Sequence, residues 1–189
     1  MKVLPTALPE IKLIVPRTIR DDRGFFVETY NRSKLREVAG IGADFVQDNH
    51  SSSEQAGVVR GLHFQIEPCA QDKLVRVVRG SICDVVVDIR VGSSCYGHHV
   101  SVVLSAENQT QLWVPKGFAH GFCTLEPGTE VVYKVTAHYD AGCDKGLAWD
   151  DPDLNIDWPV AAPAALLSDK DRTHPRLRDL PAYFYYESA

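Results

Sequence analysis

The stretch SICDVVVDIR, residues 81–90, has the two-residue alternation of a β-strand. Apolar side chains occupy one face and polar side chains the other, with Val86 as the exception: Cys83, Val85, Val87 and Ile89 against Asp84, Asp88 and Arg90. The run Lys73–Arg79 precedes this strand, and the junction Gly80-Ser81 is typical of a two-residue hairpin. The two runs therefore predict an antiparallel strand pair.

Further strand-like runs follow at spacings of roughly ten residues, namely 100–104, 109–114, 119–125 and 130–137. Helix signals are scarce: 31–38 is one short helix that Gly40 ends, and 164–170 predicts a turn or two. This pattern favours an all-β fold, a cupin-type double-stranded β-helix (jelly roll) with a few short helices. We expect one domain over 1–189, with a jelly-roll core at about 44–138, an N-terminal extension (1–43) and a C-terminal cover (139–189).

Composition narrows the class of protein. The chain has 189 residues, 44% hydrophobic and 24% charged, with a net charge of −5, which argues against unspecific binding to nucleic acid. Prolines and charges interrupt residues 1–16, so we expect neither a signal peptide nor a membrane span, and a cytoplasmic location. The cysteines form no C-x-x-C pair and are interpreted as reduced packing residues: Cys69, Cys83, Cys95, Cys123 and Cys143.

Two histidines are the main candidates for chemistry. The stretch RGLHFQ, residues 60–65, places His63 between apolar neighbours, close behind the fixed positive charge of Arg60. The stretch 113–122 brings His120 into a second apolar strand after a Pro-Lys-Gly turn. Each histidine alone could be a core residue bonded to a backbone carbonyl. Together they indicate a pocket.

A metal-dependent cupin is one alternative, since Pro115, Gly117 and His120 match the second cupin motif. The first motif is broken, because Phe64 and Gln65 follow His63 where a paired histidine is needed. A tight divalent site generally needs three or four ligands, and here only Glu67 could join the two histidines. The sequence therefore favours acid–base chemistry without a metal.

Two further residues suit that chemistry. Tyr133 shares a strand face with Val131 and Val135, so its ring should point into the barrel as a proton donor, or else as a structural tyrosine. Lys73 shares a face with Val75 and Val77, where an ammonium group could stabilise an enolate. The other interpretation is a lysine that extends to water from the end of a strand.

The chain contains a series of motifs in a fixed order: DRGFFVE (22–28), FVQDNHS (45–51), RGLHFQ (60–65), KLVRV (73–77), DVVVDIR (84–90), LSAEN (104–108), QLWVPKGFAHGF (111–122), YKVT (133–136), WDDP (149–152) and LSDKD (167–171). Through these motifs the chain resembles the dTDP-4-dehydrorhamnose 3,5-epimerase family from about residue 9 to 171. The resemblance implies a cupin-type jelly roll and a homodimer. It also implies epimerisation of dTDP-4-dehydro-6-deoxy-D-glucose at C3 and C5, without a cofactor or metal.

The same resemblance implies roles for individual residues. His63 matches the base, Asp171 the carboxylate that orients it, Tyr133 the acid and Lys73 the cation at the C4 oxygen. The positions implied to bind the dTDP-sugar are Arg23, Phe26, Glu28, Gln47, Asn49, Arg60, His120 and Tyr139. Of these, Arg60 suits a diphosphate, and Phe26 and Tyr139 are candidates to stack on thymine.

Several alternatives stay open at this level. Relatives epimerise only C3 or only C5, or act as ketoisomerases, and Tyr133 favours an epimerase over a ketoisomerase. A metal-dependent cupin enzyme and a catalytically silent dTDP-sugar binding module are the other readings. The aromatic tail 183–186 is expected to cover a hydrophobic surface rather than to bind a ligand.

Overall fold

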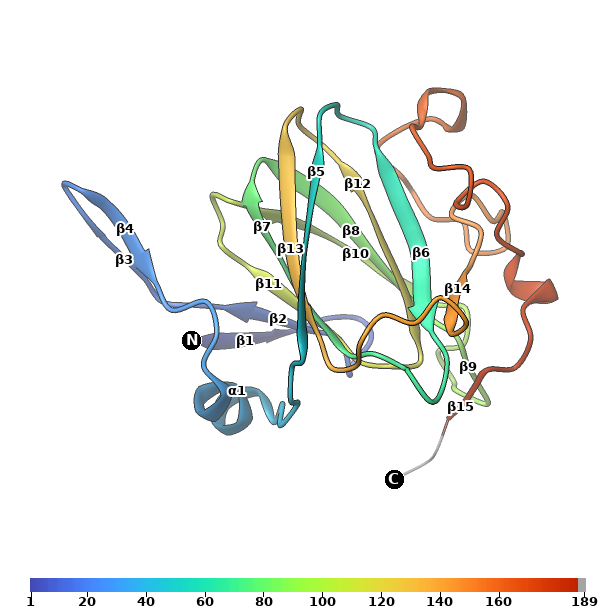
Figure 1. Ribbon diagram of the computed structural model, residues 1–189, viewed down its shortest axis with the longest axis horizontal. Coiled ribbons are helices and arrows are strands. Elements are labelled where there is room, and N and C mark those ends of the chain that lie inside the picture. The colour runs from blue at the N-terminus through green and yellow to red at the C-terminus, as the bar shows by residue number, and fades with distance from the viewer. Residues whose placement is uncertain (187–189) are drawn as a thin grey trace.

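Two β-sheets facing each other dominate the computed structural model, which describes residues 1–186 (Figure 1). The six-stranded sheet has the order β1 (Lys2–Pro5), β2 (Lys12–Val15), β11 (Gln111–Val114), β7 (Lys73–Arg79), β13 (Thr129–Val135), β5 (Gln47–Ser53). The five-stranded sheet has the order β10 (His99–Ser105), β8 (Ser81–Asp88), β12 (Phe118–Thr124), β6 (Val59–Gln65), β14 (Asp144–Gly146). Every pairing within these two sheets is antiparallel, which confirms the all-β jelly roll.

The predicted hairpin between residues 73–79 and 81–90 is wrong. β7 and β8 follow each other in the chain but belong to different sheets, β7 between β11 and β13 and β8 between β10 and β12. Gly80 makes the corner with a positive φ of 72°, and a Cβ there would collide with Thr129. The two-residue pattern identified both strands correctly, but it carries no information about which strand lies beside which.

β8 is buried on both faces. Ile82 and Val86 belong to the cluster that fills the space between the sheets, whereas Val85 and Val87 belong to a second cluster under the C-terminal segment. In that second cluster Tyr183 and Phe184 pack against the Phe64 ring, at centroid distances of 5.8 and 6.1 Å. The expected covering role of the aromatic tail is thus confirmed for these two rings.

The polar face of β8 is also interior. Asp84 and Asp88 have no exposed surface, and each finds a cationic or histidine partner, Asp88 with Arg90 and Asp84 with His120. Burial of such carboxylates is tolerable only because these partners satisfy them. One face of β8 therefore packs under the C-terminal segment with apolar side chains, whereas the face between the sheets combines the apolar Ile82 and Val86 with the paired carboxylates.

Helical structure is short. α1 (Arg32–Ala39) begins at Asn31, whose side chain accepts a hydrogen bond from the Lys34 amide, and ends at Gly40 in the left-handed conformation, as predicted. The helical turns expected at 164–170 are wrong. A single 3-10 turn, η1 (Ala162–Ala164), comes earlier, and a second, η2 (Leu177–Asp179), follows later.

The reason for that difference is a backbone contact with the sheet. Leu166 donates to the Gly57 carbonyl at 3.0 Å and accepts from the Val59 amide at 2.9 Å, so this segment runs extended beside the start of β6. These tertiary hydrogen bonds replace the local ones of a helix. The next residues, 167–172, are thereby led across the end of β6 toward His63.

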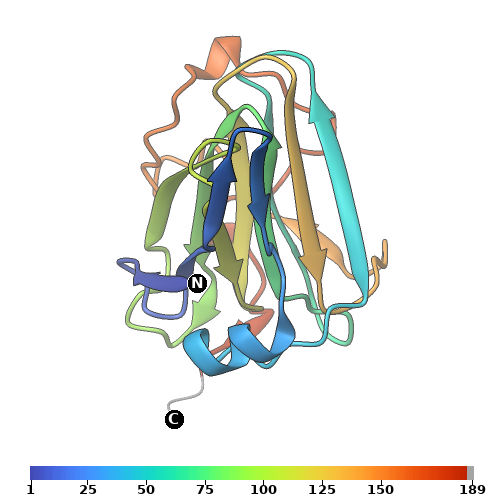
Figure 2. The ribbon, with the colours of Figure 1, turned by 90° about the vertical axis from the view of Figure 1, so that its left-hand side faces the viewer.

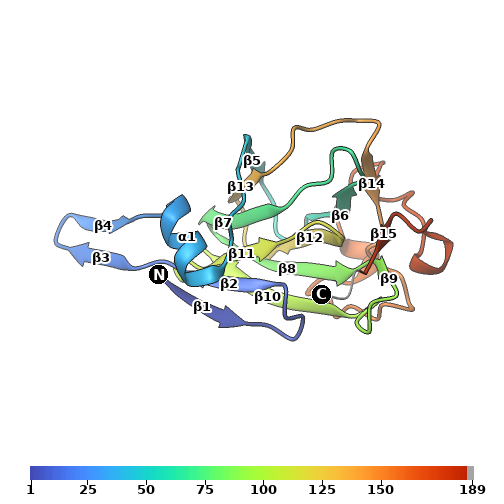
Figure 3. The ribbon, with the colours of Figure 1, turned by 90° about the horizontal axis from the view of Figure 1, so that it is seen from below.

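A hairpin projects from the body of the molecule. β3 (Thr18–Asp21) pairs with β4 (Gly24–Val27), and Figures 1 and 3 show this hairpin extending away from both sheets on the side of the N-terminus. Its apolar side chains Ile19, Phe25 and Phe26 are 52%, 54% and 69% exposed. We call residues 18–27 the arm.

The remaining small element is a parallel pair of β9 (Arg90–Val91) with β15 (Phe184–Tyr185), which attaches the C-terminal segment to the body.

Seen after a quarter turn, helix α1 lies below the strands of the six-stranded sheet (Figure 2). None of the helices in residues 1–186 has the length and apolar character needed to cross a bilayer.

Candidate active site

One cleft with two lobes lies between the sheets and the C-terminal segment. The lobes have volumes of about 460 and 410 Å³ and share His63, Lys73, Tyr133 and Lys170. Arg60, His120 and Asp171 line the first lobe. The second lobe is lined by the remaining polar side chains, Gln47, Asn49, Gln65, Gln71, Tyr139 and Asp144.

His63 and Asp171 form a dyad at the wall of this cleft. Nε2 of His63 lies 2.5 Å from Oδ1 of Asp171, and the Asp171 backbone amide is held by Ser168 Oγ at 3.2 Å. The His63 side chain is 32% exposed and that of Asp171 is 4% exposed. The carboxylate is therefore fixed behind the imidazole, while the imidazole itself reaches the cleft.

The surroundings of the dyad shift both pKa values downward. Burial lowers the pKa of His63, and the neighbouring Asp171 opposes that shift only in part. Burial acts to raise the pKa of Asp171, but the nearby imidazoles of His174 and His63 bring it below its usual range. The dyad consequently rests as a neutral imidazole beside an ionised carboxylate, which is the state a general base requires.

Lys73 and Tyr133 face this dyad from the other sheet, since β7 and β13 belong to the six-stranded sheet and β6 to the five-stranded one. The Lys73 ammonium donates to the His63 carbonyl at 3.2 Å, and burial lowers the pKa of Lys73 to about 8. Burial also raises the pKa of Tyr133. Among residues 1–186 no group hydrogen-bonds to the Tyr133 hydroxyl, which leaves it available to a ligand.

His120 lines the first lobe and forms a second histidine–carboxylate pair, with Asp84. Its Nε2 lies 2.9 and 3.0 Å from the two oxygens of Asp84, and the β12–β6 register places it directly opposite His63. Glu67 lies at the surface instead, with Oε1 2.8 Å from Lys116 Nζ. The structure thus does not assemble His63, His120 and Glu67 into the ligand set that the metal-dependent cupin alternative requires.

Five of the eight expected binding residues line the cleft: His120 and the four described next. The Arg60 guanidinium is oriented by Ser53 Oγ at 3.3 Å and by the Ser52 carbonyl at 3.0 Å. In the second lobe, the amide of Gln47 donates to Asn49 Oδ1 at 2.8 Å and its oxygen accepts from the Tyr139 amide at 3.0 Å. The ring of Tyr139 is exposed, and its hydroxyl donates to Asp144 at 3.1 Å.

The other three are not brought to this cleft. Arg23 and Phe26 lie on the arm and Glu28 directly follows it, and none of them lines either lobe. Arg23 instead bonds to Asp21, Glu28 lies 2.8 Å from Lys34, and Phe26 is largely exposed. Within one chain, the arm and the cleft are separate.

The polar residues of the site that sequence reasoning missed include Asp84, Asp144, Lys170 and His174. Lys170 lines both lobes and pairs with Asp144. Its place beside Asp171 in the LSDKD motif was a usable signal, but His174 has no sequence signal of its own. Its position follows from tertiary packing alone.

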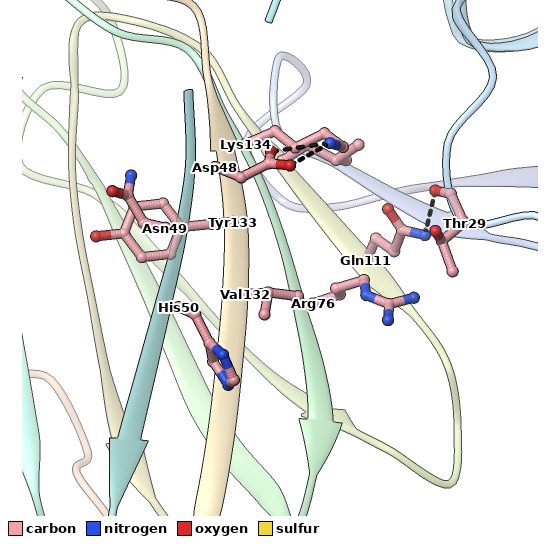
Figure 4. Close-up of a pocket in the computed structure, with 10 residues that line it drawn as sticks. Thr29, Asp48, Asn49, His50, Arg76, Gln111, Val132, Tyr133 and Lys134 are labelled. Carbon is pink, nitrogen blue, oxygen red and sulfur yellow. Dashed lines mark hydrogen bonds and ion pairs between the residues drawn. The ribbon is translucent and has the colours of Figure 1, made fainter. Parts of the chain in front are cut away.

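A separate hollow of about 300 Å³ lies on the other face of the six-stranded sheet (Figure 4). Figure 4 shows Asn49 and Tyr133 on one side of β5 and β13 and the Asp48–Lys134 pair turned away from them. Strand alternation explains this division, because successive side chains point to opposite faces. This hollow does not contain the dyad, so it is not the candidate active site.

The pH dependence of kcat/KM should reflect the lowered pKa values of His63 and Lys73. The rate is expected to fall in acid only below pH 6.5, because His63 must be neutral and its pKa is lowered. It is expected to fall again as the pH rises through about 8, where the Lys73 ammonium loses its charge. Lys73→Arg keeps the charge and should move the alkaline limb upward. An alkaline limb unchanged in that variant would assign it to another group.

A histidine base on one sheet is backed by a carboxylate from the C-terminal segment and faces a phenol and a buried ammonium on the other sheet. This arrangement defines an acid–base enzyme of the jelly-roll class. Comparison with known proteins agrees with this description. The family model for dTDP-4-dehydrorhamnose 3,5-epimerase matches residues 5–179. The chain belongs to this family of isomerases.

Individual relatives support the assignment. The dTDP-4-dehydrorhamnose 3,5-epimerase of Sinorhizobium fredii is 54% identical over 181 residues, covering 95% of this chain and 91% of that protein. A Legionella pneumophila 3,5-epimerase, solved in complex with dTDP-4-keto-L-rhamnose, superposes with a TM-score of 0.94 at 42% identity and 99% coverage of both chains. A 3'-monoepimerase from Streptomyces bikiniensis, solved with dTDP-quinovose, is 31% identical, with a TM-score of 0.86 and coverage of 94% and 88%.

Proposed function

We propose that this enzyme epimerises dTDP-4-dehydro-6-deoxy-D-glucose at C3 and C5 to dTDP-4-dehydro-L-rhamnose, a step of dTDP-L-rhamnose biosynthesis. The observation that supports this most is that His63, paired with Asp171, and Tyr133 lie on facing sheets around one cleft. C3 and C5 are both α to the C4 ketone. A base on one side of the sugar and an acid on the other can therefore invert either carbon through an enolate.

Each inversion needs one proton removed and one delivered. Nε2 of His63 is engaged by Asp171, so Nδ1 accepts the proton of C3 or C5, and the ring becomes an imidazolium that the carboxylate stabilises. The electron pair moves to the C4 oxygen, where the Lys73 ammonium stabilises the enolate. The Tyr133 hydroxyl then donates a proton to the opposite face of the carbon. His63 then loses its proton to solvent and Tyr133 regains one from solvent, and both steps are completed before the second inversion and again before the next turnover.

The binding roles follow the same geometry. Arg60 is held at the cleft with its guanidinium oriented by β5, which suits it to a diphosphate oxygen. Gln47 and Asn49 offer amide groups to the sugar or nucleotide, and the exposed ring of Tyr139 can stack on thymine. His120 supports the floor of the cleft below the base.

The relatives favour a double over a single epimerisation. Identity is 54% to a 3,5-epimerase but 31% to a 3'-monoepimerase with a similar overall fold. The alternative is a C3- or C5-only epimerase of another dTDP-4-keto-deoxysugar pathway. In this alternative only one of the two carbons exchanges its proton with solvent, but the base that removes the proton is the same.

Proton NMR in deuterated water tests the function directly. The purified enzyme with the 4-keto sugar nucleotide should incorporate solvent deuterium at both C3 and C5 and form the L-sugar. Deuterium at only one carbon would support the single-epimerase alternative. Binding of dTDP without any exchange would contradict the proposal and favour a silent binding module.

We further propose that the enzyme works as a homodimer whose arm enters the partner's cleft. The arm projects from the body, exposes two phenylalanines, and carries or adjoins Arg23, Phe26 and Glu28, which lie away from the cleft of their own chain. An exposed apolar hairpin gains stability by burial against another subunit. A cytoplasmic location fits the free thiols of all five cysteines.

Mixed dimers should reveal the exchange of arms. Neither His63→Ala nor an arm variant with Arg23→Ala and Phe26→Ala is expected to be active as a homodimer. When the two are mixed, a native arm from the His63→Ala chain meets an intact base in the other chain. Random pairing should restore about one quarter of the wild-type sites. An arm that served its own chain would give no recovery.

A further inference from the structure

A third side chain, His174, converges on the His63–Asp171 dyad. Nε2 of His174 lies 3.4 Å from Oδ1 of Asp171, and the ligand atoms of the three residues all lie within 4.8 Å of one another. The His174 side chain is only 9% exposed. Its Nε2 has no hydrogen-bond partner among residues 1–186, although it points at the carboxylate. A buried, unpartnered nitrogen of this kind requires an explanation.

The fold makes a specific place for this ring. His174 follows the 170–173 turn and packs edge-to-face on His63, at 5.5 Å between centroids and 84° between planes. Its other neighbour is Gly146 of β14, which pairs with His63 across the sheet. A Cβ at position 146 would collide with the His174 imidazole. The glycine is therefore what allows the second imidazole to lie beside the first.

We propose that His63, Asp171 and His174 form a site for one Zn²⁺ ion that inhibits the enzyme reversibly. Two imidazole nitrogens and a carboxylate oxygen are ligands that zinc prefers, and three protein ligands leave a fourth position open to the cleft. At bond lengths of about 2.0 Å, tetrahedral ligands are about 3.3 Å apart. The His174–Asp171 distance of 3.4 Å already fits, and the His63–Asp171 distance of 2.5 Å has to open slightly.

Inhibition follows from the tautomers of His63. In the dyad its proton is on Nε2 and the lone pair of Nδ1 is free. When zinc binds Nε2, the proton of the neutral ring moves to Nδ1, which then has no lone pair to accept a substrate proton. This consequence rests on the proposed role of His63 as base, whereas zinc binding itself does not. The ammonium groups of Lys73 and Lys170 lie near His63 and oppose a cation, so the site should bind and release zinc.

Titration of the metal-free enzyme with zinc chloride, followed by calorimetry, tests the site. The expected result is one ion per chain. His174→Gln should weaken the affinity by about 10-fold or more, the scale typical for damage to a metal site. Gly146→Ala should do the same by displacing the His174 ring while all three ligand residues remain. His50→Gln is the matched control, since His50 pairs with Glu130 on the outer surface, and it should bind zinc like wild type.

Inhibition is then measured by deuterium exchange at C3 and C5 over the same zinc concentrations. Zinc should suppress exchange in wild type, and His174→Gln should need about 10-fold or more zinc for the same fractional loss. Equal zinc affinity of wild type and a folded His174→Gln variant, or no binding at all, would overturn the site and leave the epimerase proposal intact. Zinc bound through His174 without loss of exchange would confirm the site but contradict His63 as the base.

Discussion

His63→Ala should abolish solvent exchange at both C3 and C5 of the 4-keto sugar. One imidazole serves both carbons in the proposed mechanism, so neither exchange can persist without it. Loss of a general base costs about 10²–10⁴ in rate. Because the side chain reaches the cleft without contributing to the core, the fold should survive its removal. Exchange is measured by proton NMR in deuterated water.

Arg60→Ala is the matched comparison for that experiment. Arg60 lines the cleft and is proposed to bind the diphosphate, so its loss should raise KM more than it lowers kcat. His63→Ala should show the reverse, with dTDP affinity changed only a few-fold. If a folded His63→Ala variant lost nucleotide binding instead, His63 would be a binding residue and not the base.

Tyr133→Phe should separate proton removal from inversion. The phenol is proposed to deliver the proton on the face opposite His63, and the two residues lie on facing sheets. Without the hydroxyl, His63 can still remove a proton and return it to the same face. Exchange with solvent should therefore persist while formation of the L-sugar falls by about 10²-fold or more. The substitution removes one oxygen and leaves the ring packed against the core cluster.

The measurement compares deuterium incorporation with the yield of inverted sugar in the same sample. Tyr96→Phe serves as a control, because it removes a phenol from a loop that lines neither lobe of the cleft, and it should match wild type. If exchange and inversion fall together in Tyr133→Phe, the phenol supports the enolate or the fold. If neither falls, another group donates the proton.

Local patterns in the sequence predicted most of the elements. Side-chain alternation identified the strands from 73 to 135, and the cap residues Asn31 and Gly40 bounded the helix. These signals are local, because they depend on which way neighbouring side chains point and on which backbone groups need partners. Because these signals are local, they could not predict two features correctly, the connection between β7 and β8 and the segment 164–170. The Gly80 corner and the extended path of Leu166 are set by contacts with distant strands.

The sequence by itself determined the strand pattern, the helix ends and the family resemblance that led to His63, Lys73, Tyr133 and Asp171. Only the tertiary structure decided that β7 and β8 lie in different sheets, that the arm lies away from its own cleft, and that His174 joins the dyad. His63 and Asp171 are 108 residues apart, and nothing in their neighbours in the chain specifies a distance of 2.5 Å. That distance results from packing of the C-terminal segment on β6 and β14, a long-range contact that no local periodicity encodes.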